Sequence, residues 1–459
     1  MIVNRDIINP NILFDGMTRD DLFKLINRWK RLLICEYDAR KGQTLALAII
    51  TVNPNHIACI FAAAELGLKL LVITKPISHE TIHATKMGIF GPVDITVSQG
   101  FAEDDPHSEM IERYSRKICL EEEINHVTND KDTATVDISP DDSLIFASTS
   151  GTTGTSKPVM FSHREVYEIS KRNIDIFAFN NNSVVVHTTS FHHASGMLTF
   201  VIPALMVADK HFYGGISWIP VTMKTTYPPE EFVRKFIVTE KADMMLVNMP
   251  NAIIWLSEFI EKYKDQIHHK VKLNTSGFTI PERFYDYCKN LPLELYSHYG
   301  SVDTGIPLLV NHVTDKSEYH SGLLGMKMDN FYQMNDETVS CHLWEKSRPL
   351  PDKLRLDNGI YFYESRMEDK DIVPLPAGMS EIFNEQYGEH IVVASKDKPF
   401  LIVWNSEKSS DLHQTVAFGK TEINLMFKKI LYLNKMDFMV DTKVSMEQLR
   451  AYLEHHYAV

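Results

Sequence analysis

Ser148-Thr-Ser-Gly-Thr-Thr-Gly-Thr-Ser-Lys157 is the most distinctive segment of the chain. Apart from two glycines and one lysine, its residues all carry hydroxyl groups, and it contains no carboxylate. Glycines let backbone N–H groups approach an anion, hydroxyls donate further hydrogen bonds, and the lysine supplies positive charge. The apolar run at residues 144–147 predicts a buried strand directly before this loop. The composition predicts a phosphate-binding loop, with a flexible surface linker as the alternative.

The loop differs from the G-x-x-x-x-G-K-[ST] phosphate loop, because its two glycines are too close together and its lysine does not follow a glycine. Residues 144–166, LIFASTSGTTGTSKPVMFSHREV, instead resemble the phosphate-loop signature of the adenylate-forming superfamily of acyl- and aryl-CoA synthetases, peptide-synthetase adenylation domains and luciferases. That signature usually reads T-S-G-T-T-G-x-P-K-G, whereas this chain has Ser156 before the lysine and Pro158 after it. The resemblance implies that the phosphates are contacted by Thr149, Ser150, Gly151, Thr152, Thr153, Gly154 and Lys157.

Length and charge narrow the class of protein. At 459 residues the chain exceeds what one hydrophobic core usually serves, so two or more domains are expected. The formal net charge of −13 argues against a nucleic-acid partner or an anionic membrane surface, since both reward clustered Lys and Arg. No apolar run approaches ~20 residues, so no membrane span is expected.

The cysteines and the N-terminus bear on location. The five cysteines are scattered and form no C-x-x-C pair, which argues against a disulfide framework and against a zinc site. The first residues lack the basic and apolar regions of a signal peptide. Together these features favour a cytoplasmic location.

Local patterns predict several elements. Thr18 followed by early carboxylates predicts the start of an amphipathic helix. Residues 44–50, 54–66 and 68–73 read as strand, helix and strand, a βαβ unit that implies a parallel sheet. Residues 103–140 are rich in charge and poor in periodicity, and they predict a solvated connection.

The resemblance also implies an architecture. It predicts an α/β fold with a large N-terminal domain, residues 1–366, built of parallel-rich αβα subdomains that bind ATP and carboxylate. A small β subdomain is expected near residues 322–344, where short segments alternate. Residues 367–459 would form a small, mobile α+β lid domain, with the hinge at Glu368.

Further motifs place residues around the acid and the nucleotide. His193 matches an H-x-x-G turn that borders the carboxylate substrate in the superfamily, and Gly277 matches the glycine-rich turn against adenine. Tyr299, Gly300 and Asp303 match Y-G-x-T-E, which implies that the tyrosine stacks near adenine and that the aspartate holds Mg²⁺. Aspartate is one methylene shorter than glutamate but remains a hard oxygen ligand.

The matches near the C-terminus are looser. Asp352 and Arg366 take the places of the aspartate that accepts the ribose hydroxyls and the arginine that contacts the nucleotide. Asn358-Gly359 between them also predicts a simple surface hairpin. Lys443 aligns with the adenylation lysine, although the tail around it reads as helix-forming and would otherwise make it an ordinary surface lysine.

The implied chemistry is ATP- and Mg²⁺-dependent activation of a small-molecule carboxylate as an acyl-adenylate, followed by acyl transfer. CoA is the leading acceptor; the thiol of a carrier-protein pantetheine, with an acyl carrier protein as partner, and an amine are the alternatives. An acyl or aryl acid is preferred over an amino acid. Because Val302 replaces the threonine that contacts the α-phosphate, a nucleotide-binding relative without turnover is a second reading. A phosphotransferase using the same loop is a third, but it leaves the C-terminal match unexplained.

Overall fold

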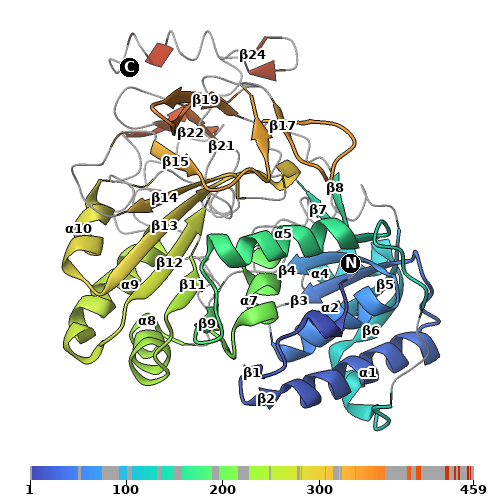
Figure 1. The fold of residues 1–459 in the computed structure, drawn as a ribbon. Helices are drawn as coiled ribbons and strands as arrows, with labels where there is room; N and C mark the ends of the chain where they lie inside the picture. The colour runs from blue at the N-terminus through green and yellow to red at the C-terminus, as the bar shows by residue number, and fades with distance from the viewer. Residues whose placement is uncertain are drawn as a thin grey trace.

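The protein is described by a computed structural model. It describes residues 3–49, 53–74, 92–100, 106–131, 136–148, 158–188, 196–214, 227–247, 250–276, 280, 282–304, 307–313, 320, 323–335, 338–350 and 352–366, and, nearer the C-terminus, 390–393, 400–404, 429–433, 439–440, 443–444, 452–453 and 455. Two large sheets with helices packed on them dominate these residues (Figure 1). This arrangement confirms the predicted α/β fold.

The first sheet has six strands in the order β6-β5-β3-β4-β7-β8. All neighbouring strands in it are parallel except β7 and β8, which are antiparallel. The predicted strand before the phosphate loop is β7, and the loop connects it to β8. The bounds are β3 (Thr44–Ile49), β4 (Lys69–Thr74), β5 (Val93–Ser98), β6 (Ser115–Leu120), β7 (Ser143–Ser148) and β8 (Pro158–Ser162).

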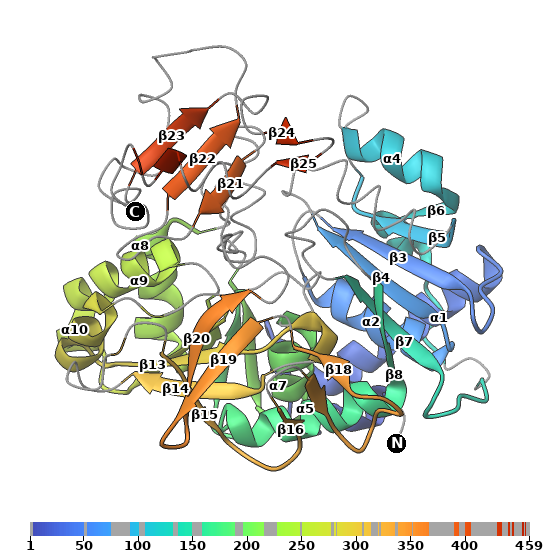
Figure 2. The same cartoon turned by 90° about the horizontal axis from the view of Figure 1, so that it is seen from above.

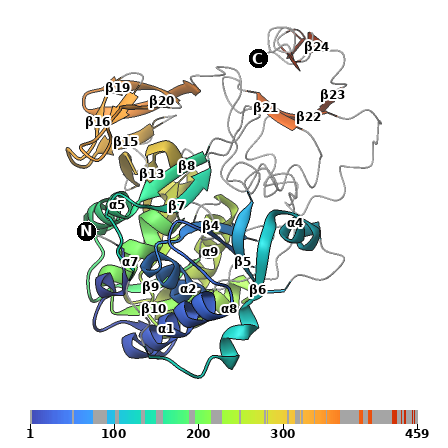
Figure 3. The same cartoon turned by 90° about the vertical axis from the view of Figure 1, so that its right-hand side faces the viewer.

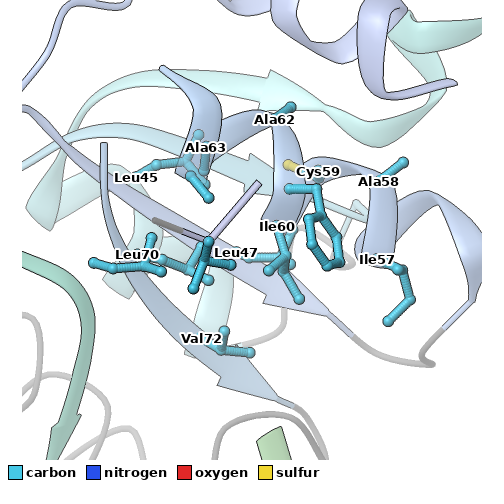
Figure 4. Close-up of a cluster of buried hydrophobic side chains, with 14 of the residues drawn as sticks. Leu45, Leu47, Ile57, Ala58, Cys59, Ile60, Ala62, Ala63, Leu70 and Val72 are labelled. Carbon is cyan, nitrogen blue, oxygen red and sulfur yellow. The ribbon is translucent and has the colours of Figure 1, made fainter. Parts of the chain in front are cut away.

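Helices α1 (Arg19–Cys35) and α2 (Pro54–Glu65) belong to the same half of the molecule. As predicted, Thr18 caps α1, and its capping box with Asp21 satisfies backbone N–H groups that a helix start leaves unpaired. Figure 4 shows apolar side chains of α2, such as Ile57 and Ile60, in one cluster with Leu45 and Leu47 of β3 and with Leu70 and Val72 of β4. The predicted βαβ unit is therefore confirmed, with β3 and β4 parallel.

The second sheet has eleven strands in the order β19-β20-β15-β14-β13-β12-β11-β9-β10-β1-β2. Its middle strands β13, β12, β11, β9, β10 and β1 run parallel, and β14, β15, β20 and β19 add antiparallel pairs. The bounds are β1 (Leu13–Phe14), β2 (Met17–Thr18), β9 (Val184–His187), β10 (Lys210–Tyr213), β11 (Met244–Leu246), β12 (Val271–Ser276), β13 (Leu293–Tyr299), β14 (Leu309–Val313), β15 (Leu323–Lys327), β19 (Asp352–Asp357) and β20 (Ile360–Arg366).

Helices α5 (His163–Ile176) and α7 (Ile202–Val207) lie between the two sheets (Figure 2), the latter preceded by a π-helix at Met197–Val201. Their apolar side chains belong to two core clusters. One cluster also contains side chains of β3 and α2, and the other contains side chains of β9 and β11. On the other side of the large sheet lie α8 (Pro229–Phe232), its π-helical continuation Val233–Thr239, α9 (Pro250–Tyr263) and α10 (Arg283–Asn290).

Short strands make up the rest. β16 (Gln333–Met334), β17 (Thr338–Ser340) and β18 (Arg348–Pro349) form a three-stranded sheet. Towards the C-terminus, β21 (His390–Val393), β22 (Phe400–Trp404) and β23 (Lys429–Leu433) form another, and β24 (Met439–Val440) pairs with β25 (Lys443–Val444). Hairpin β19–β20 lies at the same end of the molecule as β21 and β22 (Figure 3). No helix in the described part of the chain has both the length and the apolarity needed to cross a bilayer.

Two local predictions are wrong. Residues 103–140 include α4 (Pro106–Tyr114), β6 and a 3₁₀ helix at Glu121–His126 rather than a solvated connection. Their charges have partners: the Tyr37 hydroxyl lies 2.7 Å from both carboxylate oxygens of Glu123. In the tail that reads as helix-forming, the backbone of Lys443 begins strand β25.

Candidate active site

Four parallel strands of the large sheet end along one edge. β9, β11, β12 and β13 run in the same direction, so their carboxyl ends lie along a single side of the sheet. The chain leaves β9 towards His193, β12 towards Gly277, and β13 towards Gly300 and Asp303. In open α/β sheets, ligands bind at this carboxyl edge. This edge of the large sheet is therefore a candidate ligand-binding edge.

Tyr299 and Asp352 meet directly, although they are 53 positions apart in sequence. The Tyr299 hydroxyl donates a hydrogen bond of 2.9 Å to Oδ2 of Asp352. Tyr299 ends β13 and Asp352 begins β19, so the bond joins two strands that are separated by β14, β15 and β20 in the order of the sheet. Asp352 is only 6% exposed. A buried carboxylate needs hydrogen-bond donors, and this tyrosine is one of them.

The turn after Tyr299 is closed by its own hydrogen bonds. The Ser301 N–H donates to the Thr304 hydroxyl at 3.0 Å, and that hydroxyl donates to the Ser301 carbonyl at 2.8 Å. Further along, the Leu308 N–H donates to the Tyr299 carbonyl at 2.7 Å. The backbone of Asp303 lies within the resulting 3₁₀ turn, Val302–Thr304. These bonds fix the backbone of the turn.

Asp352 and Arg366, which were matched to the ribose-binding and nucleotide-contacting motifs, both lie in the β19–β20 hairpin. Asn358 and Gly359 have φ of 50° and 84°, the left-handed values that a tight two-residue turn between twisted strands requires. The predicted hairpin is therefore confirmed. Asp352 pairs with Arg366 across the strands, and the register shifts once between Lys353 and Leu354.

The phosphate loop is held at both ends by strand pairing. Ser148 at the end of β7 pairs with Pro158 at the start of β8, so the loop spans the connection of an antiparallel pair. The predicted residues that lie outside the described part of the chain are Thr149, Ser150, Gly151, Thr152, Thr153, Gly154, Lys157, His193 and Gly277.

His298, directly before Tyr299, was not singled out by the sequence. It is buried, and its Nε2 lies 3.0 Å from Oδ1 of Asn274 on the neighbouring strand. The Asn274 amide faces the Met245 carbonyl at 3.5 Å, which leaves Oδ1 as acceptor and makes Nε2 of His298 the donor. Burial lowers the pKa of His298 to about 3, so the ring is neutral and ties β13 to β12. The signal available was a histidine directly before Tyr299, in a strand that also contains Glu294 and Ser297.

Comparison with known proteins shows which family the chain resembles. Residues 14–330 match the family described as AMP-binding enzyme. The human protein Malonate–CoA ligase ACSF3, mitochondrial, is 23% identical over 175 residues, which are 35% of this chain and 28% of that ligase. The aligned stretch thus spans well under half the length of that curated relative.

Solved structures share the fold along most of the chain. O-succinylbenzoate CoA synthetase (MenE) from Bacillus subtilis, in complex with ATP and magnesium, has a TM-score of 0.66 at 15% identity, with 96% of each chain covered. Mycobacterium tuberculosis fatty acyl CoA synthetase has a TM-score of 0.64 at 14% identity, with 97% of this chain and 95% of that one covered. Since the family match covers more than half of its residues, the chain belongs to the AMP-binding enzymes of the adenylate-forming superfamily.

Proposed function

We propose that this chain joins a carboxylic acid to the AMP part of ATP, releases pyrophosphate, and then transfers the acyl group to a thiol. The observation that carries the proposal is the hydrogen bond from Tyr299 to the buried Asp352 at the carboxyl edge of β13. This bond places an aromatic ring beside a carboxylate. The ring could stack on adenine, and the carboxylate could accept hydrogen bonds from the ribose hydroxyls. The phosphate-loop sequence supplies the third element of a nucleotide site.

The proposed roles follow from charge. A carboxylate is a poor electrophile, and its attack on the α-phosphorus brings one anion towards another, so the site must neutralise the triphosphate. Residues 149–157 would hold the β- and γ-phosphates, with Asp352 and Arg366 on the nucleotide. Asp303 suits Mg²⁺ because carboxylate oxygen is its preferred ligand, and the metal supplies positive charge when bound. Lys443 would bridge carboxylate and α-phosphate, and His193 would border the acid.

The division into domains belongs to the same proposal. Residues 1–366 would bind ATP and the acid, and residues 367–459 would form a lid carrying Lys443. Rotation of that lid would withdraw the lysine and admit the acceptor. Lys443→Ala should then abolish acyl-adenylate formation while leaving the consumption of a supplied acyl-adenylate intact. Loss of both half-reactions would contradict this assignment.

CoA is the proposed acceptor, and the thiol of a carrier protein is the alternative. Both occur among similar proteins: MenE is a CoA synthetase, and McyG was solved as an adenylation domain joined to a carrier domain, with TM-scores of 0.66 and 0.65. Transfer to an amine is a further alternative. An acyl or aryl acid is proposed over an amino acid, and the partial similarity to a malonate–CoA ligase adds short dicarboxylates to the acids to be tested.

The decisive experiment is carboxylate-dependent exchange of labelled pyrophosphate into ATP, without any thiol. Separate pools of fatty, aryl, dicarboxylic and amino acids would be supplied with Mg²⁺. We expect exchange with one of the first three pools. Exchange with none of the four, in protein shown to bind ATP, would contradict adenylation of these acids.

One observation favours a second candidate, a nucleotide-binding module without turnover. Val302 stands where the superfamily has a threonine hydroxyl, and its side chain packs against the apolar core. The nearby Thr304 hydroxyl is engaged with Ser301. A hydrogen bond to a charged group contributes about 1.5–3 kcal/mol, so this loss would weaken α-phosphate stabilisation. Restoring the hydroxyl with Val302→Thr should raise the exchange rate if turnover exists, and should leave a pure binding module silent.

A further inference from the structure

Helix α5 carries a buried arginine that the proposed chemistry does not use. Arg172 is 7% exposed and lies one turn before the end of α5, between the two large sheets. A buried guanidinium is costly unless its N–H groups have partners, so its contacts show what it holds in place.

Those contacts converge on the segment that follows the candidate active-site turn. Arg172 Nε donates to Oδ2 of Asp329 at 2.6 Å, and Nη1 donates to the carbonyl of Pro307. The guanidinium also lies over the Tyr332 ring, 4.7 Å from its centroid. One side chain thus links α5, the strand entry at Pro307 and the segment between β15 and β16.

Pro307 is the end of the turn that contains Asp303. The next residue, Leu308, donates its N–H to the Tyr299 carbonyl at 2.7 Å. The chain therefore leaves β13 at Tyr299, passes through Val302–Thr304 and returns to the same carbonyl. A group that fixes the Pro307 carbonyl fixes one end of this closed loop.

We propose that Arg172 is a positioning residue that sets the Asp303 turn relative to α5 and, through α5 and β8, relative to the phosphate loop. This inference rests on the proposed function for the role of the turn, but the contacts stand without it. The planar guanidinium donates to two acceptors in different directions at once. A lysine in its place keeps the charge, but its ammonium cannot reproduce that fork geometry.

The chain offers a matched control. Arg348 in β18 also pairs with α5, through a 2.8 Å contact from Nη2 to Oε1 of Glu165, and it also lies over an aromatic ring, that of Trp344. It pairs with Glu165 in the first turn of the helix, whereas Arg172 lies near the last turn. Strand β18 itself lies beside the Val302–Thr304 turn. Arg348→Lys therefore tests whether loss of any arginine that pairs with α5 loosens this turn, whereas Arg172→Lys weakens the bond to Pro307.

The test is hydrogen–deuterium exchange of the ligand-free protein, read on peptides covering residues 299–313. In Arg172→Lys we expect exchange at least tenfold faster in these peptides than in wild type, with β3 and β4 unchanged. In Arg348→Lys we expect less than a twofold change there. Equal acceleration in both variants, or protection unchanged in Arg172→Lys, would overturn the inference.

A second readout separates positioning from general stability. In pyrophosphate exchange, Arg172→Lys should raise the half-activating Mg²⁺ concentration at least fivefold, and Arg348→Lys should not. A lower Tm with an unchanged Mg²⁺ requirement would mean a merely structural role. If Arg172→Lys fails to fold, Asp329→Asn, which keeps the Pro307 contact, replaces it. In that variant, deuterium exchange in residues 299–313 and the half-activating Mg²⁺ concentration must both rise, by smaller factors. If the wild-type protein showed no pyrophosphate exchange, the proposed function would be contradicted. The hydrogen–deuterium exchange pattern would still decide the role of Arg172.

Discussion

Both large sheets are built largely of parallel strands with helices packed on them, but the N-terminus of α2 in one differs from the carboxyl edge of the other in what occupies it. In the six-stranded sheet, the N-terminus of α2 follows β3, and the chain's own Glu121 fills it. Oε1 of Glu121 accepts hydrogen bonds from the side-chain amides of Asn53 and Asn55, both at 3.0 Å, and Oε2 lies 3.3 Å from Nε2 of His56. Helix N-termini attract anions, and this one is already neutralised.

In the eleven-stranded sheet, the carboxyl edge instead presents Tyr299, Asp352 and the Asp303 turn. A parallel sheet with helices therefore does not by itself define a ligand site. The helix N-terminus after β3 is filled by a carboxylate of the chain itself, whereas β13 leads into a segment proposed to bind the substrate and metal. Substitutions at these two places should therefore have different consequences: loss of turnover at the Asp303 turn, and loss of stability at the N-terminus of α2.

The largest expected effect is at the edge of the large sheet. Asp303→Asn removes the charge proposed to hold Mg²⁺ while keeping the side chain's size. We expect the pyrophosphate-exchange rate to fall by about 10²–10³-fold, as for other losses of transition-state charge stabilisation, with Tm within about 2 °C of wild type. A variant that keeps its rate at every Mg²⁺ concentration would remove Asp303 from the site.

A smaller effect is expected from Tyr299→Phe. The ring remains and only the hydrogen bond to Asp352 is lost. A bond to a charged group is worth about 1.5–3 kcal/mol, so we expect KM for ATP to rise by about tenfold or more, with kcat within about threefold. If kcat fell and KM stayed constant, the tyrosine would act on the reacting groups rather than on nucleotide binding.

The matching substitution in the six-stranded sheet is Glu121→Gln. We expect unfolding free energy to fall by about 1–3 kcal/mol, since buried donors lose a charged acceptor, while pyrophosphate exchange is unchanged. Burial would raise the pKa of Glu121, but hydrogen bonds from His56, Asn53 and Asn55 outweigh it and lower that pKa to about 2. The stabilisation from Glu121 is therefore present above its unfolded pKa of about 4.3 and is lost as pH falls towards 2.

Denaturant titrations of wild type and Glu121→Gln across that range would check the assignment. The difference in unfolding free energy should be constant from pH 7 to 5 and shrink below pH 4. A difference that grows on acidification would mean that the carboxyl is protonated in the native protein at neutral pH.

The smallest effect concerns buried histidines in the large sheet and in α5. Burial lowers the pKa of His163 and His211 to about 4, and that of His298 to about 3. Below pH 6.5 the unfolded chain binds protons that the native protein does not, so stability should decline steadily between pH 6.5 and 4. His298→Asn should make this decline shallower in urea titrations. An equal slope in that variant would exclude His298 as a contributor.

The sequence predicted the βαβ unit, the α1 cap and the β19–β20 turn, because each depends on neighbours within a few residues. It failed for residues 103–140, since composition does not reveal that Tyr37 binds Glu123 or that Asn53 binds Glu121. Their partners lie more than sixty positions away along the chain. For the same reason motif matching could propose Tyr299 and Asp352 separately but could not predict their direct hydrogen bond, since they are 53 positions apart on strands that are not neighbours in the sheet.

The register shift in the β19–β20 hairpin has a consequence for insertions and deletions. From the turn outwards, Asp357 pairs with Ile360 and Leu354 with Tyr363, but Lys353 pairs with Ser365, so Glu364 is an extra residue. Counting on without it would set Ser365 opposite Asp352; the bulge sets Arg366 there instead. Homologous chains that differ in length by one residue on either arm would therefore change the arginine's partner even with every motif letter retained. Alignments of such chains should place gaps at the turn in compensating pairs and never singly within the strands.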